Sequence, residues 1–482
     1  MDAPAALATT EKFWEVDAVP ILSEFIRIPC LSPEFDPAWA DHGHIARAVD
    51  LLRRWAEVRA IEGMTVDVVQ LEERTPVILC EVPPSTRADV GAAPDASSDT
   101  VLLYGHLDKQ PEFTGWRDGL GPWEPVLDGE RLYGRGAGDD GYAIFAAIGA
   151  IEAVRAAGGA HRRCVVVIEA SEESGSPDLP AYIEALAERF GSVSLVVCLD
   201  SGAETWDRMW VTTSLRGLVG LTVTVEVLEA GMHSGVGSGV VPSSFRILRQ
   251  LLSRVEDEAT GEILLPELHV EIPSDRAAQI ESAAAELTPV HLLHGAVPVD
   301  GLHPVAAGDT AAMLRNRSWR PAMATVGMEG IPEIQSAGNV LRPFTRAKIS
   351  FRLPPTCDVD RAAAALEAAL VADAPYGARV SVHAGDRGSG WNAPSSEPWL
   401  AEAIDGGATA AFGGPARYVG EGGSIPFMSM LSERYPAAQF LITGVLGPGS
   451  NAHGPNEFLH IPMAKGVTAA VAHVLDVHAR RS

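Results

Sequence analysis

Histidine and acidic side chains follow two apolar runs of this sequence. His106 and Asp108 stand just after the run at residues 100–104, and Asp200 directly follows the run at residues 193–199. Continuously apolar runs of this length are typical of strands that are buried on both faces of a parallel sheet. Ligands of open parallel sheets bind outside the carboxyl ends of the strands, so these side chains are expected at one shared edge. Imidazole and carboxylate groups without a thiolate suit zinc, manganese or cobalt.

Three further motifs add to this set. Asp139 and Asp140 precede a helical pattern, Glu172 and Glu173 follow another apolar run, and His453 lies in a loop rich in Gly and Pro. Each motif alone is typical of a helix cap, a solvated acidic pair or a surface histidine. Their ordered combination favours a metal site instead. The balance of charge favours two divalent ions over one, because two ions neutralise three carboxylates and a bridging hydroxide.

The elements that must position these residues alternate between strands and helices. Helices are predicted over residues 143–157 and 178–190, with a strand over residues 163–170 between them. This alternation predicts an α/β fold with a mostly parallel sheet that helices cover on both faces. A further helix is predicted over residues 11–28 and ends near Pro29.

The pattern changes near Val211 and changes back after Trp391. Strands in between alternate more like half-exposed ones, which is typical of an antiparallel sheet. We therefore expect a discontinuous main domain formed by residues 1–210 and 387–482. A smaller α+β unit at residues 211–386 would interrupt it, and a unit of that length can fold as a domain.

The composition of the chain limits the class of protein to which it can belong. The chain has 482 residues and a formal net charge of −26, with 46% hydrophobic residues. A chain of this length exceeds one ordinary core, so more than one domain is expected. The acidic balance offers no basic footprint, so neither nucleic acid nor a membrane is expected as a partner. Five scattered cysteines without a CxxC pair, and an N-terminus without a basic signal segment, indicate a cytoplasmic protein.

Several motifs together carry a resemblance to a known family. In chain order they are GHLDKQPE, LYGRGAGDDG, EASEESGS, the strand-end Asp200, GMHSG, ISFRLPP, EGGSIP and AHGPNE. With these motifs the chain resembles the co-catalytic metal dipeptidases, the carnosinase and cytosolic nonspecific dipeptidase group. Relatives of that group include succinyl-diaminopimelate desuccinylase and acetylornithine deacetylase. The resemblance extends from about Ile26 to His473, and the combination is specific although HxD or EE alone is a weak signal.

The resemblance implies a fold and two metal ions. A mostly parallel metallopeptidase domain would carry the site, and an inserted ferredoxin-like domain would serve as lid and dimerisation surface. His106 and Asp200 would hold one ion, Glu173 and His453 would hold the other, and Asp139 would bridge both. Zn²⁺ is the expected metal, with Mn²⁺ or Co²⁺ as alternatives. A cis peptide bond after Asp139 is implied as well.

The resemblance also assigns roles to residues that hold no metal. Asp108 would orient the ligating imidazole before it through the second ring nitrogen, and Glu172 would be the general base. His233 would reach the active site of the neighbouring subunit in a homodimer and stabilise the tetrahedral oxyanion. Arg352 would clamp the carboxylate of the substrate, where a planar fork is preferred over lysine, and Ser424 would contact the same carboxylate.

The implied reaction is hydrolysis of a dipeptide or short peptide with a free C-terminal carboxylate. Two departures bear on substrate choice: Gly141 replaces a lysine that often follows the bridging pair, and Gly420 replaces an arginine before the EGGS motif. An N-acyl amino acid deacylase would share the metals, the base and the carboxylate clamp, and is the alternative. A non-catalytic metal-binding interaction protein is the alternative from another class, but such a protein would be expected to have lost Glu172.

Overall fold

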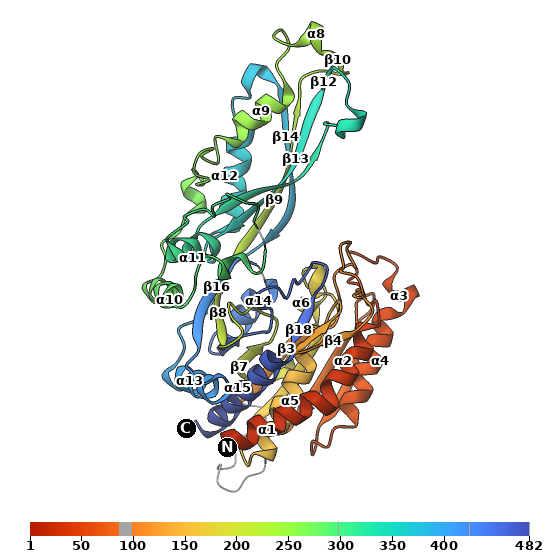
Figure 1. The fold of residues 1–482 in the computed structure, drawn as a ribbon, viewed down its shortest axis with the longest axis vertical. Coiled ribbons are helices and arrows are strands. Elements are labelled where there is room, and N and C mark those ends of the chain that lie inside the picture. Colours follow the sequence, from red (N-terminus) through yellow and green to blue (C-terminus); the bar gives the residue numbers. More distant parts are fainter. Residues whose placement is uncertain (86–98, 297, 424, 482) are drawn as a thin grey trace.

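The computed structural model describes residues 1–85, 99–296, 298–423 and 425–481. The chain forms two lobes that follow each other along its long axis, and both termini lie in the lower lobe of Figure 1. No helix among these residues is both long and apolar enough to cross a membrane. All five cysteines are buried, and none forms a disulfide.

The lower lobe is built around a sheet of six strands. In spatial order they are β1 (Thr65–Val69), β2 (Val77–Val82), β6 (Arg163–Glu169), β3 (Thr100–His106), β7 (Val193–Cys198) and β17 (Gln439–Ile442). Strands β6, β3, β7 and β17 are parallel to one another, whereas β1 and β2 add to one side in antiparallel pairing. The mixed α/β fold with a mostly parallel central sheet confirms the prediction.

Helices cover both faces of this sheet because successive strand residues point to opposite sides. In β3, Val101 and Leu103 belong to one core cluster, whereas Leu102 and Tyr104 belong to the other. The first cluster takes buried residues from α1 (Ala3–Phe13), α5 (Ala143–Ala156), α13 (Pro398–Phe412) and α15 (Ile461–Arg480). The second cluster takes them from α6 (Leu179–Ala185) and α14 (Pro426–Arg434).

The upper lobe contains an antiparallel sheet of four strands. Their order is β11 (Ala322–Glu329), β13 (Phe344–Leu353), β9 (Gly217–Glu226) and β14 (Arg379–Gly388). Helices α9 (Ser244–Leu252) and α12 (Val359–Val371) pack on one face of it and form a separate core cluster. Helix α9 buries Ile247, Leu248 and Leu251, a spacing that keeps one helix face apolar.

Two helices between these strands pack on the lower lobe instead. Helices α10 (Ser274–Ala284) and α11 (Thr310–Ser318) contribute Ile280, Ala283 and Leu314 to the first core cluster of the lower lobe. They lie against β16 (Arg417–Glu421), which forms a three-stranded sheet with β8 (Trp210–Leu215) and β15 (Trp391–Asn392). The chain therefore passes between the lobes more often than a single insertion would require.

The first helix differs from its predicted bounds. It begins at Ala3, where the Asp2 side chain accepts the Ala5 N–H, and not near residue 11. A π-helical turn at Trp14–Ala18 then leads into α2 (Val19–Ile26). Pro20 lacks the N–H that a continuous α-helix would need at this point, so the regular hydrogen-bond pattern is interrupted there.

The remaining strands and α-helices of the described residues are short, apart from α4. They are α3 (Trp39–His42), α4 (His44–Glu57), β4 (Val126–Asp128), β5 (Arg131–Tyr133), α7 (Ala187–Phe190), β10 (Met232–His233), α8 (Ser234–Gly237), β12 (Val340–Leu341) and β18 (Phe458–His460).

Candidate metal centre

The carboxyl ends of the four parallel strands deliver the side chains of the candidate site. Strand β3 ends at His106, a short turn after β6 carries Glu172 and Glu173, and Asp200 follows β7. The loop after β17 carries His453. The next two strands of this sheet along the chain, β6 and β7, lie on opposite sides of β3. This reversal of strand order opens a crevice at the end of β3, where ligands of such sheets bind.

The first group of potential ligands consists of His106, Asp139 and Asp200, which are all buried. The Nε2 atom of His106 lies 3.5 Å from Asp139 Oδ1 and 3.8 Å from Asp200 Oδ2. Hydrogen bonds are shorter than these distances. Two ligands of a tetrahedral ion with bonds of about 2.0–2.1 Å lie roughly 3.4 Å apart, which is close to the first distance.

The second group consists of Asp139, Glu173 and His453. The Nε2 atom of His453 lies 3.1 Å from Asp139 Oδ2 and 3.1 Å from Glu173 Oε2. The Asp139 carboxylate thus turns one oxygen to each group. The peptide bond between Asp139 and Asp140 is cis, as the family resemblance implies.

Two residues hold these groups from behind. The Asp108 carboxylate accepts the backbone N–H groups of Glu172 and Glu173, at 3.1 and 3.0 Å. The same residue contacts His106 Nδ1 through its backbone oxygen, at 3.1 Å, and through Oδ1, at 3.5 Å. Gln110 Nε2 donates to Glu173 Oε2 at 2.7 Å. Asp108 therefore joins the end of β3 to the acidic turn as well as facing the imidazole.

The electrostatics of the cluster show crowded carboxylates. Burial and the nearby Asp139 carboxylate raise the pKa of Asp200 to about 6, although His106 acts in the opposite sense. Burial and Asp200 raise the pKa of Glu172 well above its usual value. The partial burial of the imidazole lowers the pKa of His453, but the carboxylates of Asp139 and Glu173 outweigh it and raise that pKa to about 11. Neighbouring carboxylates contribute to each shift, and a bound cation would compensate their negative charge.

The residues present fit divalent cations. His106 Nε2 and Glu173 Oε1 are buried and have no hydrogen-bond partner among the described residues. A buried polar atom without a partner is costly, and coordination of an ion would satisfy both atoms. Imidazole and carboxylate donors without a thiolate are the set that zinc, manganese and cobalt accept.

A cavity of about 380 Å³ opens beside these groups. Its lining includes Asp139, Glu172 and His453 from the lower lobe, and Arg352 from β13 of the upper lobe. Glu421, at the end of β16, lines the same cavity. The structure therefore brings the predicted ligands, the predicted base and the predicted carboxylate clamp to one place.

Two further residues were predicted for the site, Ser424 and His233. Ser424 lies outside the described residues. His233 lies on β10 at the far end of the upper lobe (Figure 1), where it is exposed. Within one chain, His233 therefore belongs to neither of the described metal groups.

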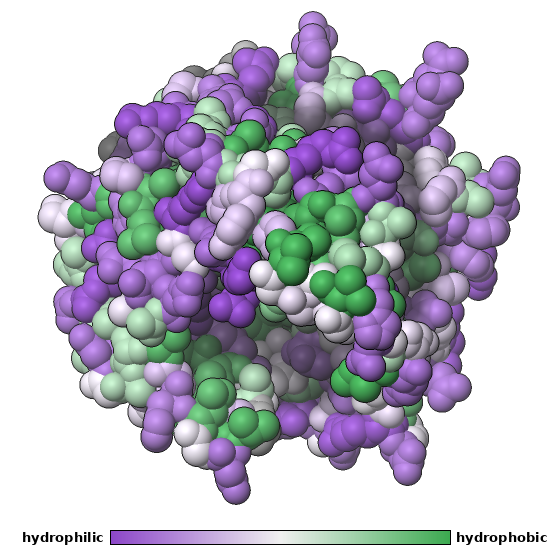
Figure 2. Space-filling model, turned by 90° about the horizontal axis from the view of Figure 1, so that it is seen from above, coloured by the Kyte–Doolittle hydropathy of each residue, from purple (hydrophilic) through white to green (hydrophobic). Residues whose placement is uncertain are grey.

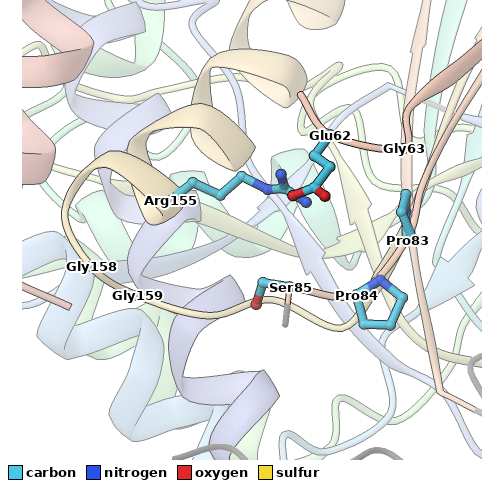
Figure 3. A pocket seen from close by; sticks show the side chains of 8 residues that line it. All are labelled: Glu62, Gly63, Pro83, Pro84, Ser85, Arg155, Gly158 and Gly159. Carbon is cyan, nitrogen blue, oxygen red and sulfur yellow. The ribbon is translucent and has the colours of Figure 1, made fainter. Parts of the chain in front are cut away.

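A larger hollow of about 620 Å³ lies elsewhere (Figure 3). Its lining includes Pro83, Ser85 and Gly158, which follow the end of β2 and the end of α5. Because β2 is antiparallel to β6, this hollow is at the edge of the sheet opposite the metal groups. Its lining provides one carboxylate, Glu62, and one guanidinium, Arg155, so it does not gather the ligands of a metal centre.

Sequence reasoning missed several residues of the site. Gln110 and Glu421 stand inside the motifs GHLDKQPE and EGGSIP, so their position in a strand-end motif was the available signal. Arg135 and Glu457 also stand inside motifs, but no residue pattern indicated that they form an ion pair with each other, at 2.6 Å. Such pairing depends on the three-dimensional arrangement of two distant loops.

Comparison with known proteins agrees with this geometry. The model of peptidase family M20/M25/M40 matches residues 102–476. Cysteinylglycine-S-conjugate dipeptidase of Corynebacterium striatum is 30% identical over 396 residues, which are 77% of this chain and 81% of that protein. Beta-Ala-His dipeptidase of Homo sapiens is 29% identical over 283 residues, 58% of this chain and 54% of that protein. The structure of the dipeptidase Dug1p from Saccharomyces cerevisiae is similar in fold, with a TM-score of 0.77 at 23% identity over 100% of both chains. Since the family model covers well over half of the sequence and the ligand motifs lie within it, the chain belongs to peptidase family M20/M25/M40.

Proposed function

We propose that this peptidase hydrolyses dipeptides or short peptides that have a free C-terminal carboxylate. The observation that carries the proposal is the shared cavity, in which the metal groups and Glu172 face Arg352 from the other lobe. A guanidinium at that position suits a planar carboxylate, because its donors form a fork. The names of the two relatives, a cysteinylglycine-S-conjugate dipeptidase and a Beta-Ala-His dipeptidase, support a dipeptide as substrate.

Two divalent ions would occupy the site. His106 and Asp200 would hold one ion, Glu173 and His453 the other, and Asp139 would contribute an oxygen to each. Zn²⁺ is the proposed metal, and Mn²⁺ or Co²⁺ would fit the same donors. Such ions supply Lewis acidity, which polarises the scissile carbonyl and lowers the pKa of water.

Glu172 would act as general base. Its carboxylate lines the cavity, and Oε2 lies 3.9 Å from His106 Nε2. Asp108 holds the backbone of the turn, so the carboxylate is oriented before substrate binds. Glu172 would accept a proton from the attacking water and deliver it to the departing amine. The presence of this side chain also disfavours a non-catalytic metal-binding interaction protein.

Arg352 and Ser424 would bind the C-terminal carboxylate of the substrate. Burial lowers the pKa of Arg352, yet a guanidinium remains charged at neutral pH. A partly buried cation gains more from an anionic ligand than a fully exposed one, because water screens the interaction less. Ser424 belongs to this proposal on the basis of its motif alone.

Glu421 favours a dipeptidase over an N-acyl amino acid deacylase. Its Oε1 atom is buried and has no hydrogen-bond partner within the described residues. Burial raises the pKa of this carboxyl group, and the nearby Arg317 opposes that effect. An ammonium group at the substrate N-terminus would give Glu421 a charged donor, whereas an N-acyl group carries no charge.

A homodimer would complete the site. His233 lies too far out on the upper lobe to serve the described cavity of its own chain, so we propose that it serves the partner's site. The edge strand β11 exposes Val326 and Met328. Viewed from above the upper lobe, hydrophobic side chains gather in patches among hydrophilic ones (Figure 2). The unit at residues 211–386 would thus act as lid and dimerisation surface, in a protein of the cytoplasm, where its unpaired cysteines would stay reduced.

The test combines metal loading with a substrate panel. Apoprotein is reconstituted with Zn²⁺ or Mn²⁺, the bound metal is counted, and dipeptides are compared with acetyl- and succinyl-amino acids that share the same C-terminal residue. We expect two ions per chain and faster turnover of the dipeptides. Faster turnover of the acylated compounds would contradict the dipeptidase proposal and favour the deacylase.

The variant Glu421→Gln sharpens this comparison. It should lower kcat/KM for dipeptides by about tenfold or more, because a charge-assisted hydrogen bond is lost. It should leave the slower turnover of acetyl-amino acids nearly unchanged. An equal loss on both kinds of substrate would contradict the role of Glu421 as acceptor of the amine.

A further inference from the structure

A buried ion pair joins two loops that carry candidate ligands. Arg135 lies four residues before Asp139, and Glu457 lies four residues after His453. Arg135 Nη1 donates to Glu457 Oε2 at 2.6 Å, and the two side chains are 1% and 0% exposed. Neither residue lines the cavity beside the metal groups. The pair therefore lies behind the site and is not positioned to touch a substrate.

The second oxygen of Glu457 binds the backbone that leads into Asp139. Oε1 accepts the N–H groups of Gly136, Gly138 and Asp139, at 3.0, 3.2 and 3.2 Å. Successive backbone N–H groups of this kind form a concave site for an anion. The Glu457 carboxylate occupies that site and so fixes the backbone from which the Asp139 side chain extends.

Arg135 extends the same network to two more segments. Its Nε donates to Pro111 O at 3.1 Å, and its Nη2 donates to Gly454 O at 2.7 Å. Pro111 follows Gln110, whose amide holds Glu173, and Gly454 directly follows His453. One guanidinium thus ties together the loops after β3 and β17 and the loop before α5.

The loop of His453 needs this support because of its backbone conformation. Asn451, His453 and Asn456 have φ angles of 56°, 60° and 64°. Residues other than glycine adopt this left-handed region infrequently, although Asn and His do so more often than most, and three such residues in one loop indicate that the surroundings hold its backbone. The His453 side chain itself is 56% exposed, so packing around the imidazole provides little of that restraint.

From these contacts we propose that Arg135 and Glu457 are positioning residues for the ion held by Asp139, Glu173 and His453. The inference rests on the two-ion proposal. Without the pair, the backbone before Asp139 and the loop of His453 are no longer fixed relative to each other. The ion of His106 and Asp200 shares Asp139 with the other ion but takes no ligand from the loop of His453, so its affinity should fall less. Groups behind metal ligands typically change metal affinity by about 10–100-fold.

The key variant is Glu457→Gln. Its side chain has nearly the same shape, but one oxygen becomes an amide nitrogen. That nitrogen faces either the three backbone N–H groups or Arg135, and both are donors. Arg135→Lys is the second variant, because it keeps the charge next to Glu457 but cannot donate to Pro111, Gly454 and Glu457 in the same planar fork.

Glu81→Gln is the matched control. Glu81 Oε1 pairs with Arg163 Nη2 at 2.6 Å, and the side chains of Glu81 and Arg163 are 22% and 15% exposed. Arg163 begins β6, so this pair lies at the edge of the sheet opposite the metal groups. The control therefore makes the same chemical change in a mostly buried ion pair that touches no ligand loop.

The experiment is a calorimetric titration of each apoprotein with Mn²⁺, with circular dichroism to verify the fold. Electron paramagnetic resonance of the loaded proteins reports the coupling between two neighbouring Mn²⁺ ions. We expect two ions in the wild type. In Glu457→Gln and Arg135→Lys, the second ion, which Asp139, Glu173 and His453 would hold, should bind at least about tenfold more weakly. The resonance signal of coupled Mn²⁺ pairs should accordingly decline at limiting Mn²⁺. Glu81→Gln should bind both ions like the wild type.

Three results would overturn the inference, and they are distinguishable. If both variants lose thermal stability but bind both ions with unchanged affinity, the pair has a structural role only. If Glu81→Gln weakens the second ion to the same extent, the effect is a general consequence of lost stability. If the wild type itself binds a single ion at saturating Mn²⁺, the two-ion proposal is wrong, and the pair has no second ion to position.

Discussion

The two adjacent acids Glu172 and Glu173 illustrate how neighbouring residues take different roles. Asp108 binds both backbone N–H groups, so the turn is shared. Both side chains line the cavity, but the Glu173 side chain contacts His453 and Gln110, whereas the Glu172 side chain lies near His106. Because the backbone is common to both, only the direction of each side chain separates a ligand from a base.

Substitution of each acid should separate the two roles. Glu172→Gln should retain two ions and lower kcat by at least about 100-fold, because the proton acceptor is lost. Glu173→Gln should instead weaken metal retention. Metal analysis after dialysis, together with kcat at saturating metal, measures both. Equal loss of metal in the two variants would contradict this assignment of base and ligand.

Lys109 is a buried cation next to the site, and it has no role in the proposed reaction. Its Nζ donates to Phe25 O and Ile28 O, both at 2.9 Å, and lies 4.0 Å from the centre of the Phe25 ring. Phe25 lies in the last turn of α2, where helical C=O groups lack partners further along the helix, and Ile28 lies just beyond that end. Lys109 therefore fastens the end of α2 to the loop that carries Asp108.

The stability of the protein should depend on pH through Lys109. Burial lowers its pKa from 10.5 to about 8. Between these values the unfolded chain binds a proton that the folded chain has lost, so the free energy of unfolding rises with pH in this window. Relative to Lys109→Met, the wild type should gain on the order of 3 kcal/mol from pH 8 to pH 10.5. Urea unfolding at several pH values measures the difference, and parallel curves for the two proteins would contradict it.

At the scale of elements, the packing of α1 against α5 depends on a glycine. A Cβ atom at Gly149, in the middle of α5, would lie 2.7 Å from the Phe13 ring of α1. Phe13 is itself held edge-on against Trp14 and Trp55. The ring therefore has little room to move.

Gly149→Ala should accordingly destabilise the protein in spite of the higher helix propensity of alanine. Overpacking of a core costs about 1–3 kcal/mol, whereas the propensity gain is about 1 kcal/mol. Gly414→Ala is a suitable control, because its Cβ would meet only Arg208, at 3.8 Å. Thermal unfolding of the two variants tests this. A Tm of Gly149→Ala at or above that of the wild type would show that α1 can shift to accommodate the added methyl group.

The strands that carry the site were predictable, whereas the placement of several helices was not. Mostly apolar runs such as Val193–Cys198 indicate a buried strand on their own, and the residues after the run are then placed at the strand end. Helices α10 and α11 are different. An apolar helix face indicates that something covers it, but both lobes offer a core, and the sequence pattern does not distinguish between them.

The site followed the same division. The positions of His106, Glu173 and Asp200 could be predicted because each lies at or shortly after the end of a strand of one sheet. The contacts of Asp108 with the acidic turn, and the pairing of Arg135 with Glu457, could not be predicted, because they join loops whose relative position depends on the whole fold.

At the scale of the whole molecule, His233 lies at the far end of the upper lobe (Figure 1), whereas the cavity lies beside the metal groups. Mixing a His233→Ala chain with a Glu172→Gln chain tests whether His233 acts on the partner's site. If it does, a mixed dimer contains one site with both residues intact, and activity should return on subunit exchange. Loss of an oxyanion donor typically costs about 10²–10³-fold in kcat, so the recovery should be easy to measure. With exchange verified separately, no recovery would mean that His233 acts within its own chain or not at all.

Because all five cysteines are buried, modification of their thiols can report the unfolding of this protein. Cys357 belongs to the core of the upper lobe, whereas Cys30, Cys80, Cys164 and Cys198 belong to the two cores of the lower lobe. Burial also raises the pKa of Cys80 and Cys164 to about 12, so these thiols are unreactive while the lobe stays closed. An alkylating reagent followed by intact-mass measurement would thus record how the lobes open in time. A species with a single added group would mark the upper lobe opening alone, and a direct step to five groups would mark one cooperative event.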